Sequence, residues 1–128
     1  PVPALRTHVE NGERIIETPT DFKDYNAGDA RVDYVAYVPP GSIARGALIA
    51  SRGDASTPAC ESCHGAKLGG SDVIPPLAGR SPTYLVRELI LFRTGQRSNP
   101  GASPMVQAAA HLSVHDMIAV AAYAASRK

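Results

Sequence analysis

The chain has 128 residues, enough for one domain, with 44% hydrophobic residues, 5% aromatic residues and no tryptophan. Its formal net charge is +1, and it has no basic run or basic helix face of the kind that binds nucleic acid. No stretch approaches the ~20 apolar residues of a transmembrane helix, so we expect a protein that does not span a membrane.

Residues 1–41 are expected to form an irregular N-terminal extension. Two short strands are predicted within it, at 14–18 and 32–38, where β-branched and aromatic residues alternate with polar ones. The first forty residues carry seven acidic and four basic side chains, whereas the remainder carries five acidic and nine basic ones. The start of the chain lacks a basic segment followed by an apolar one, so we expect no signal peptide here and, if the protein is exported, a processed form.

The signals become helical from Ser42 onward. The segment 42–52 has apolar residues at helical spacing, with Ser42 as the expected N-cap. Gly46 lies inside this helix, where glycine costs about 1 kcal/mol relative to alanine, which predicts a close contact with another helix. A short helical turn is then predicted over residues 60–64.

Two further helices have clear end signals. In 81–95, Ser81 is the expected cap, Pro82 takes the first helical position and Gly95 ends the helix. In the second, Ser113 begins an S-x-x-D capping box for a helix over 114–126.

The connecting segments 65–80 and 96–107 are rich in glycine, proline and polar residues and are expected to be long loops. The predicted fold class is therefore all-α, with three to four helices in a domain that covers residues 42–128.

Chemistry is concentrated in the sequence ACESCHG, which contains both cysteines of the chain, Cys60 and Cys63, followed by His64. A disulfide between the two cysteines would close a very small loop and add little stability. A thioredoxin-like pair is expected after a strand in a βαβ unit, whereas here a Ser/Thr/Pro loop precedes the motif. A zinc site needs four ligands, and none of the other three histidines (His8, His111 and His115) forms a typical ligand pair with the motif.

The pattern C-x-x-C-H favours a fourth interpretation, covalent attachment of one c-type haem. Two thiols three residues apart on a helical turn suit the two vinyl groups of the porphyrin, and the adjacent imidazole suits the iron. A bound ring system would also account for a core so poor in aromatic side chains.

The chain resembles the class I c-type cytochromes over about residues 42–128. The resemblance rests on the helix with Gly46, on CESCHG, and on PPLAG (75–79), whose proline follows His64 by eleven residues. The helix-forming segment 81–97, the methionine-containing segment and the last helix follow in the family's order. The resemblance extends to the second haem domain of two-haem bacterial cytochromes, in which a stretch like YVAYVPPGSIARG leads into the haem domain.

The resemblance implies a fold of helices around a covalent haem, with His64 and a methionine as the two iron ligands. Met105 occupies the place at which the family has this methionine, in the segment before the final helix. Met117 lies within that helix and has the pattern of a core residue. His111 and His115 are the alternative second ligands, for a bis-histidine haem.

The resemblance also implies further contacts with the haem. Pro75 corresponds to the proline whose carbonyl accepts a hydrogen bond from the ligand histidine. Arg80, Tyr84 and Arg97 are candidates for the haem propionates, and for each of the two arginines the alternative is a solvated charge at a helix end. Leu77, Leu89 and Phe92 are expected to line the ring.

Histidine and methionine together leave no open position on the iron, which implies one-electron transfer and not enzymatic catalysis. The expected partners are redox proteins: a dehydrogenase as donor, and an oxidase or another cytochrome as acceptor. One alternative is a dedicated electron-accepting subunit or domain of a dehydrogenase, which would explain the acidic extension. A second is a haem enzyme or ligand sensor with an open iron site. The attachment chemistry of the family implies the bacterial periplasm.

Overall fold

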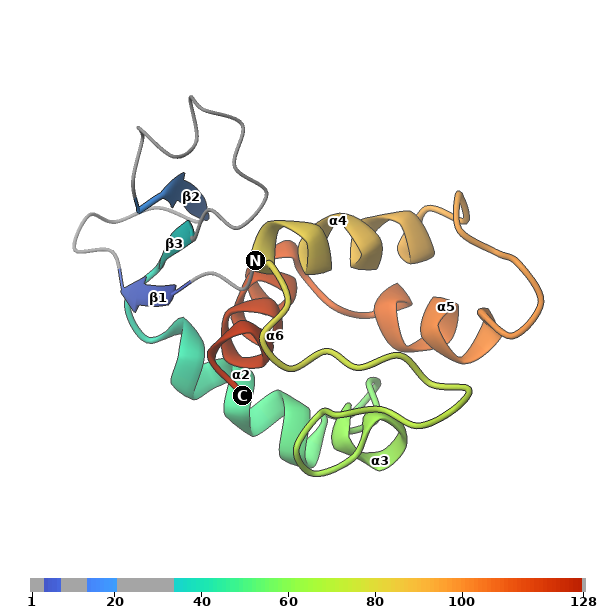
Figure 1. Cartoon of the computed structure of the whole chain (residues 1–128). Helices are drawn as coiled ribbons and strands as arrows, with labels where there is room; N and C mark the ends of the chain where they lie inside the picture. The colour runs from blue at the N-terminus through green and yellow to red at the C-terminus, as the bar shows by residue number, and fades with distance from the viewer. Residues whose placement is uncertain (1–3, 8–13, 21–33, 128) are drawn as a thin grey trace.

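The computed structural model describes residues 4–7, 14–20 and 34–127. Within these residues it contains five helices and a three-stranded sheet, and the sheet lies to one side of the helices (Figure 1). The expected turns between the two predicted strands, and His8, lie outside the described residues.

The sheet contains the two predicted strands and one that was not predicted. Strand β2 covers Ile16–Pro19 and β3 covers Tyr34–Val38, which confirms the strands expected at 14–18 and 32–38. The added strand, β1 (Ala4–Thr7), pairs with β3 in parallel, and β2 pairs with β3 antiparallel, giving the order β1-β3-β2. Strand β3 is therefore central, and its Val35, Ala36 and Val38 are buried.

The first and last of the described helices, α2 (Ser42–Arg52) and α6 (Val114–Ser126), pack against each other. Gly46 of α2 is buried at this contact, and a Cβ there would overlap the carbonyl of Ala119 in α6. Helix α6 is buried along most of its length and forms the centre of the core. The predicted close helix contact at Gly46 is confirmed.

The start of α2 differs from the prediction. The N-cap is Gly41, with φ of 82°, a left-handed conformation that glycine adopts without strain. Ser42 is the first helical residue, and its buried hydroxyl donates to the Pro39 carbonyl oxygen at 2.6 Å. The prediction of Ser42 as the cap was wrong because the preceding Pro-Pro-Gly turn carries the chain directly into the helix.

The predicted ends of the other two long helices are confirmed. Helix α4 covers Pro82–Arg93 and α6 begins at Val114. The Ser81 hydroxyl accepts a hydrogen bond from the amide of Tyr84, and the Ser113 hydroxyl accepts one from the amide of Asp116. The carboxylate of Asp116 is directed to Arg45 of α2, with Nε of the arginine 3.2 Å from Oδ1, and so adds an ion pair to the α2–α6 contact.

A fifth helix, α5 (Ser103–Ala110), lies where a loop was expected. The glycines and prolines of this segment indicated a loop, but Pro104 sits in the first turn, where proline is tolerated. The three alanines that follow are strong helix formers. The described residues therefore contain one helix more than the three to four predicted.

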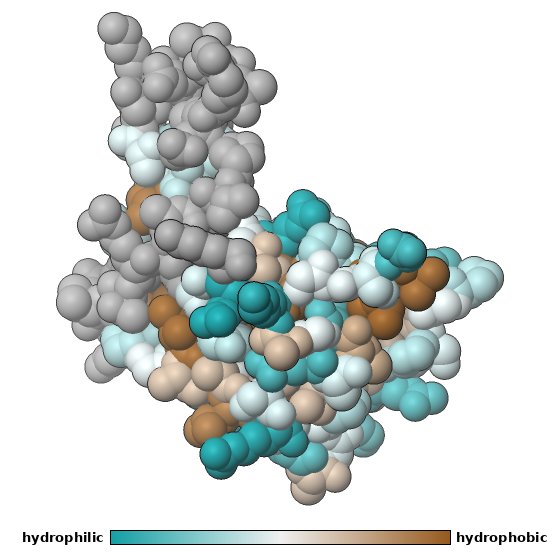
Figure 2. All heavy atoms as spheres, turned by 60° about the horizontal axis from the view of Figure 1, so that its bottom comes forward, coloured by the Kyte–Doolittle hydropathy of each residue, from teal (hydrophilic) through white to brown (hydrophobic). Residues whose placement is uncertain are grey.

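Within the described residues, no helix is both long and apolar enough to cross a membrane. A space-filling view from the side of α3 (Glu61–His64) shows pale and hydrophilic residues over most of the surface, with hydrophobic atoms in a few separate groups (Figure 2).

Candidate functional site

The C-x-x-C-H motif forms the short helix α3 and the residue before it. Cys60 precedes the helix, and its carbonyl accepts hydrogen bonds from the amides of Cys63 and His64 at 3.3 and 3.0 Å. This turn places the two cysteines and the histidine close together, as the spacing predicted. The two cysteines do not form a disulfide with each other.

The two cysteines lie in different surroundings. Cys63 is exposed, whereas Cys60 packs against an apolar cluster that includes Leu68, Leu85 and Ala121. Burial raises the pKa of the Cys60 thiol, and the nearby carboxylate of Glu61 adds to the effect. A reactive redox cysteine instead has its pKa lowered, so these surroundings do not favour the dithiol interpretation.

His64 is 6% exposed, and its Nδ1 lies 2.9 Å from the carbonyl oxygen of Pro75. A carbonyl oxygen only accepts, so Nδ1 carries the proton and donates. The Nε2 atom is then the unprotonated ring nitrogen, which is the form that binds a metal. The structure thus brings Pro75 to His64 as the sequence predicted.

The segment between α3 and α4 is fixed by backbone hydrogen bonds. The Leu68 carbonyl accepts from the amides of Leu77 and Ala78 at 2.8 and 3.1 Å, and Gly79 donates to the Ala124 carbonyl of α6 at 3.0 Å. Leu68 is buried with φ of 55°, a left-handed conformation that is uncommon for leucine and is held by these bonds. The segment that carries Pro75 is therefore anchored both to the cysteine motif and to the core.

Met105 lies on α5 and is half-buried. It packs against a cluster formed by Phe92 of α4 with Ala102 and Ala109, and Leu89 of α4 packs against the same cluster. Phe92, which is predicted to line a ring, thus belongs to the cluster against which both Met105 and Leu89 pack. Leu77 instead packs with Cys60 in the cluster around Leu68.

The other methionine and the two described histidines lie elsewhere. Met117 is fully buried in a separate cluster with Ile49, Leu112 and Val120. His111 and His115 are both exposed. In the described part of the chain, no group of three or more His, Cys, Asp or Glu side chains is arranged to hold a metal ion, so these residues provide no zinc site.

The three side chains predicted near the propionates lie at the two ends of α4. Arg80 and Tyr84 are exposed at the start, and Arg87 stacks on the Tyr84 ring with its guanidinium carbon 5.7 Å from the centroid. Arg97 lies beyond the end of α4, where its guanidinium donates to Glu88 and lies 4.6 Å from the centre of the Phe92 ring. No local pattern indicated Glu88 as a partner of Arg97, because a separation of nine residues is not a helical contact spacing.

These residues fit a covalent haem. They provide two thiols on one turn, a buried imidazole whose Nδ1 bonds to a carbonyl oxygen, and apolar side chains from three segments. The sulfur of Met105 is a further soft ligand on a different element from His64. No zinc-like or thioredoxin-like arrangement competes with this interpretation among the described residues.

Comparison with known proteins agrees with this fit. No protein-family model matches the chain. It is 35% identical over 80 residues to cytochrome c-554(548) of Halomonas halodenitrificans, a match that covers 62% of this chain and 96% of the relative. It is 39% identical over 84 residues to a thiosulfate dehydrogenase electron acceptor of Stutzerimonas stutzeri, which covers 63% of this chain and 39% of that protein.

A solved structure shows the same likeness. Reduced recombinant cytochrome c4 from Pseudomonas stutzeri superposes with a TM-score of 0.66 at 31% identity, and the match covers 75% of this chain and 53% of that one. The chain thus spans about half the length of this two-haem relative and nearly the whole of the shorter cytochrome. The chain belongs to the class I c-type cytochromes, carries haem c covalently on Cys60 and Cys63, and functions in electron transfer.

Proposed function

We propose that His64 and Met105 are the two iron ligands and that the protein carries single electrons between redox proteins. The observation that supports this most directly is the bond from Nδ1 of His64 to the Pro75 carbonyl, which leaves Nε2 unprotonated. When bound, haem c supplies an iron centre that changes its oxidation state by one electron.

Met105 is the better supported of the two methionines. Its half-buried side chain packs against the cluster that contains Phe92, a side chain predicted to line the ring. Leu89 packs against this cluster and against the cluster of Met117, so it does not distinguish the two methionines. Met117, in contrast, is enclosed by Ile49, Leu112 and Val120 and packs as an ordinary core residue. A thioether ligand favours the ferrous state more than a second imidazole does, which suits an electron acceptor.

His64 and Met105 would together hold the iron and would leave no position on it open to external ligands. The exposed positions of His111 and His115 argue against a bis-histidine centre. For the propionates, Arg80 is the best supported cation, since Arg97 is already paired with Glu88. Tyr84 is a further candidate from the same end of α4.

We further propose that residues 42–128 form the haem domain and residues 1–41 an N-terminal extension, whose Glu17 bonds to Ser81 and Thr83 of that domain. The donor is a dehydrogenase, and the acceptor is an oxidase or another cytochrome. The similarity to a thiosulfate dehydrogenase electron acceptor supports a dehydrogenase donor. The covalent attachment of haem supports the bacterial periplasm as the location.

A second candidate function is a dedicated electron-accepting subunit or domain of a dehydrogenase. The same relative favours it, because its name describes the electron acceptor of a dehydrogenase. The two candidates differ in how long the complex lasts. Purification of the protein from its source by size exclusion distinguishes them, because a subunit elutes with a large enzyme and a free carrier elutes alone.

The ligand assignment is tested by the near-infrared absorption band that arises from sulfur bound to ferric haem iron. We expect the band in the wild type, its loss in Met105→Ala, and its retention in Met117→Leu, which keeps a core side chain of similar size. Loss of the band in Met117→Leu with retention in Met105→Ala would overturn the assignment. A wild-type spectrum without the band would exclude methionine ligation altogether.

A further inference from the structure

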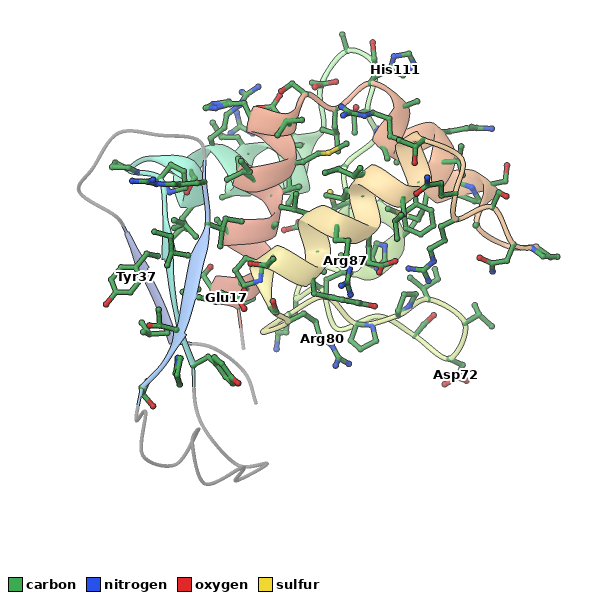
Figure 3. The ribbon with its side chains drawn as sticks, turned by 90° about the horizontal axis from the view of Figure 1, so that it is seen from above. Glu17, Tyr37, Asp72, Arg80, Arg87 and His111 are labelled. Carbon is green, nitrogen blue, oxygen red and sulfur yellow. The ribbon has the colours of Figure 1, made fainter. Side chains whose placement is uncertain are left out.

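One carboxylate of the extension bonds to the start of α4. Oε1 of Glu17, in β2, accepts a hydrogen bond from the Ser81 hydroxyl at 2.7 Å and another from the backbone amide of Thr83 at 3.1 Å. Figure 3 shows Glu17 directed from the sheet toward the start of α4. These partners lie 64 and 66 residues further along the chain, so no local sequence pattern predicts the contact.

A carboxylate stabilises a helix most when it lies at the start of that helix. The first four amides of a helix have no partner within it, and the peptide dipoles place partial positive charge there. At α4 the Ser81 hydroxyl accepts from the amide of Tyr84 and donates to Glu17, while Glu17 also accepts from the amide of Thr83. The cap of α4 is therefore built by two residues, of which one comes from the extension.

Helix α4 leads from this cap to the methionine. Leu89 and Phe92, two and three turns along α4, belong to the same packed cluster as Met105 and Ala109 of α5. Because packed side chains transmit small displacements, the position of α4 affects the position of α5. A displacement of the first turn of α4 is therefore transmitted along the rigid helix and through direct apolar contacts to Met105.

We propose that Glu17 is a positioning residue for Met105, acting through the cap of α4. This inference rests on the proposed role of Met105 as iron ligand. It assigns to the extension a function within the haem domain. The strands fix the position of α4, and α4 in turn keeps α5 and its Met105 in place. The extension is then part of the electron-transfer unit and not an arm for docking a partner.

The test compares Glu17→Ala, Glu17→Gln and the control Asp72→Asn in the haem-loaded protein. Glu17→Gln keeps an acceptor oxygen and loses the charge. Asp72→Asn removes a carboxylate from an exposed loop, at a distance from Glu17 (Figure 3). Hydrogen exchange is followed at the amide of Thr83, which reports the cap, and at the amide of Val106, which bonds to the Ala102 carbonyl at 3.0 Å and reports α5. The rate of cyanide binding to the ferric protein reports how often Met105 leaves the iron.

We expect exchange at Thr83 to rise about five-fold in Glu17→Ala, the factor that corresponds to a typical capping loss. Exchange at Val106 and the rate of cyanide binding should rise together with it. In Glu17→Gln, the exchange rates at Thr83 and Val106 and the rate of cyanide binding should return a large part of the way to the wild-type values. Asp72→Asn should match the wild type in all three. Faster exchange at Thr83 with unchanged Val106 exchange and cyanide binding would show that Glu17 only caps α4, and would overturn the proposal.

Failure of the ligand assignment has a different signature. If Met105 does not bind iron, either the wild type lacks the near-infrared band or Met105→Ala retains it, and the rate of cyanide binding in Met105→Ala equals that of the wild type. The exchange at Val106 still decides whether Glu17 holds α5. An unchanged Val106 rate in Glu17→Ala rejects the positioning role whatever the second ligand is.

Discussion

Gly46 of α2 lies directly against the carbonyl of Ala119 in α6, with no room for a Cβ between them. The nearest atoms are backbone, which cannot rotate away as a long side chain can. The crossing of the first and last of the described helices therefore depends on glycine at this position.

The first prediction follows from this contact. Gly46→Ala should lower the free energy of unfolding by up to about 2 kcal/mol, because overpacking costs about 1–3 kcal/mol and the better helix propensity of alanine returns only about 1 kcal/mol. Guanidinium unfolding of the haem-loaded protein measures it. Ala44→Gly, at an exposed position of the same helix, is the control and should cost about 1 kcal/mol from propensity alone. A stabilised Gly46→Ala variant would contradict the close contact.

Thr57 carries the second prediction. It is 3% exposed and lies three residues before Cys60, and within the described residues its hydroxyl oxygen is buried without a hydrogen-bond partner. An unsatisfied buried hydroxyl costs about 1–3 kcal/mol, so the nearly isosteric Thr57→Val should be neutral or more stable by about 1 kcal/mol.

Thermal unfolding measures this, with Thr94→Val as the control. The Thr94 hydroxyl donates to the Ile90 carbonyl oxygen at 3.0 Å and is exposed, so its removal should give no gain. A loss of stability in Thr57→Val larger than in Thr94→Val would show that the Thr57 hydroxyl has a partner in solution, such as an internal water.

Asp54 gives the third prediction, which concerns pH. Its Oδ1 accepts from the amides of Ser56 and Thr57, both at 2.9 Å, and these bonds lower the pKa of the carboxyl below its ordinary value of 3.8. A lowered native pKa means that the unfolded chain binds the proton more tightly. The stabilisation from Asp54 is therefore fully present above pH 3.8 and is lost as the pH falls through the native pKa.

The measurement is the free energy of unfolding of wild type and Asp54→Ala as a function of pH. The difference between the two should stay constant between pH 5 and 7 and shrink as the pH falls below 3.8. A difference that grows in acid would contradict the direction of the pKa shift. The Asp72→Asn variant serves as the control, because Asp72 lies in an exposed loop.

Local patterns predicted the parts of this fold that depend on neighbouring residues. The serine caps at Ser81 and Ser113 and the turn from Cys60 to His64 were all correct, because capping and helical spacing act within four residues. The position of Pro75 could be expected only from the resemblance to a family. The bond to His64 depends on how an irregular loop folds back over eleven residues.

The errors and omissions have physical causes. Helix α5 was missed because glycine and proline before it outweighed the alanine run, although Pro104 falls where a helix accepts it. Strand β1 pairs with β3 about thirty residues away, and Glu17 reaches α4 over 64 residues. Such pairings are decided by tertiary packing, to which a single sequence gives no local signal.

The measurement that tests the account most directly is carbon monoxide binding to the reduced wild-type protein, followed by its absorption spectrum. If His64 and Met105 both bind the iron, the spectrum should remain unchanged on addition of carbon monoxide, while Met105→Ala should bind it readily. Rapid binding of carbon monoxide by the wild type would mean that the iron has an open position. The protein would then be a haem enzyme or a ligand sensor, and the proposed closed electron-transfer centre would be wrong.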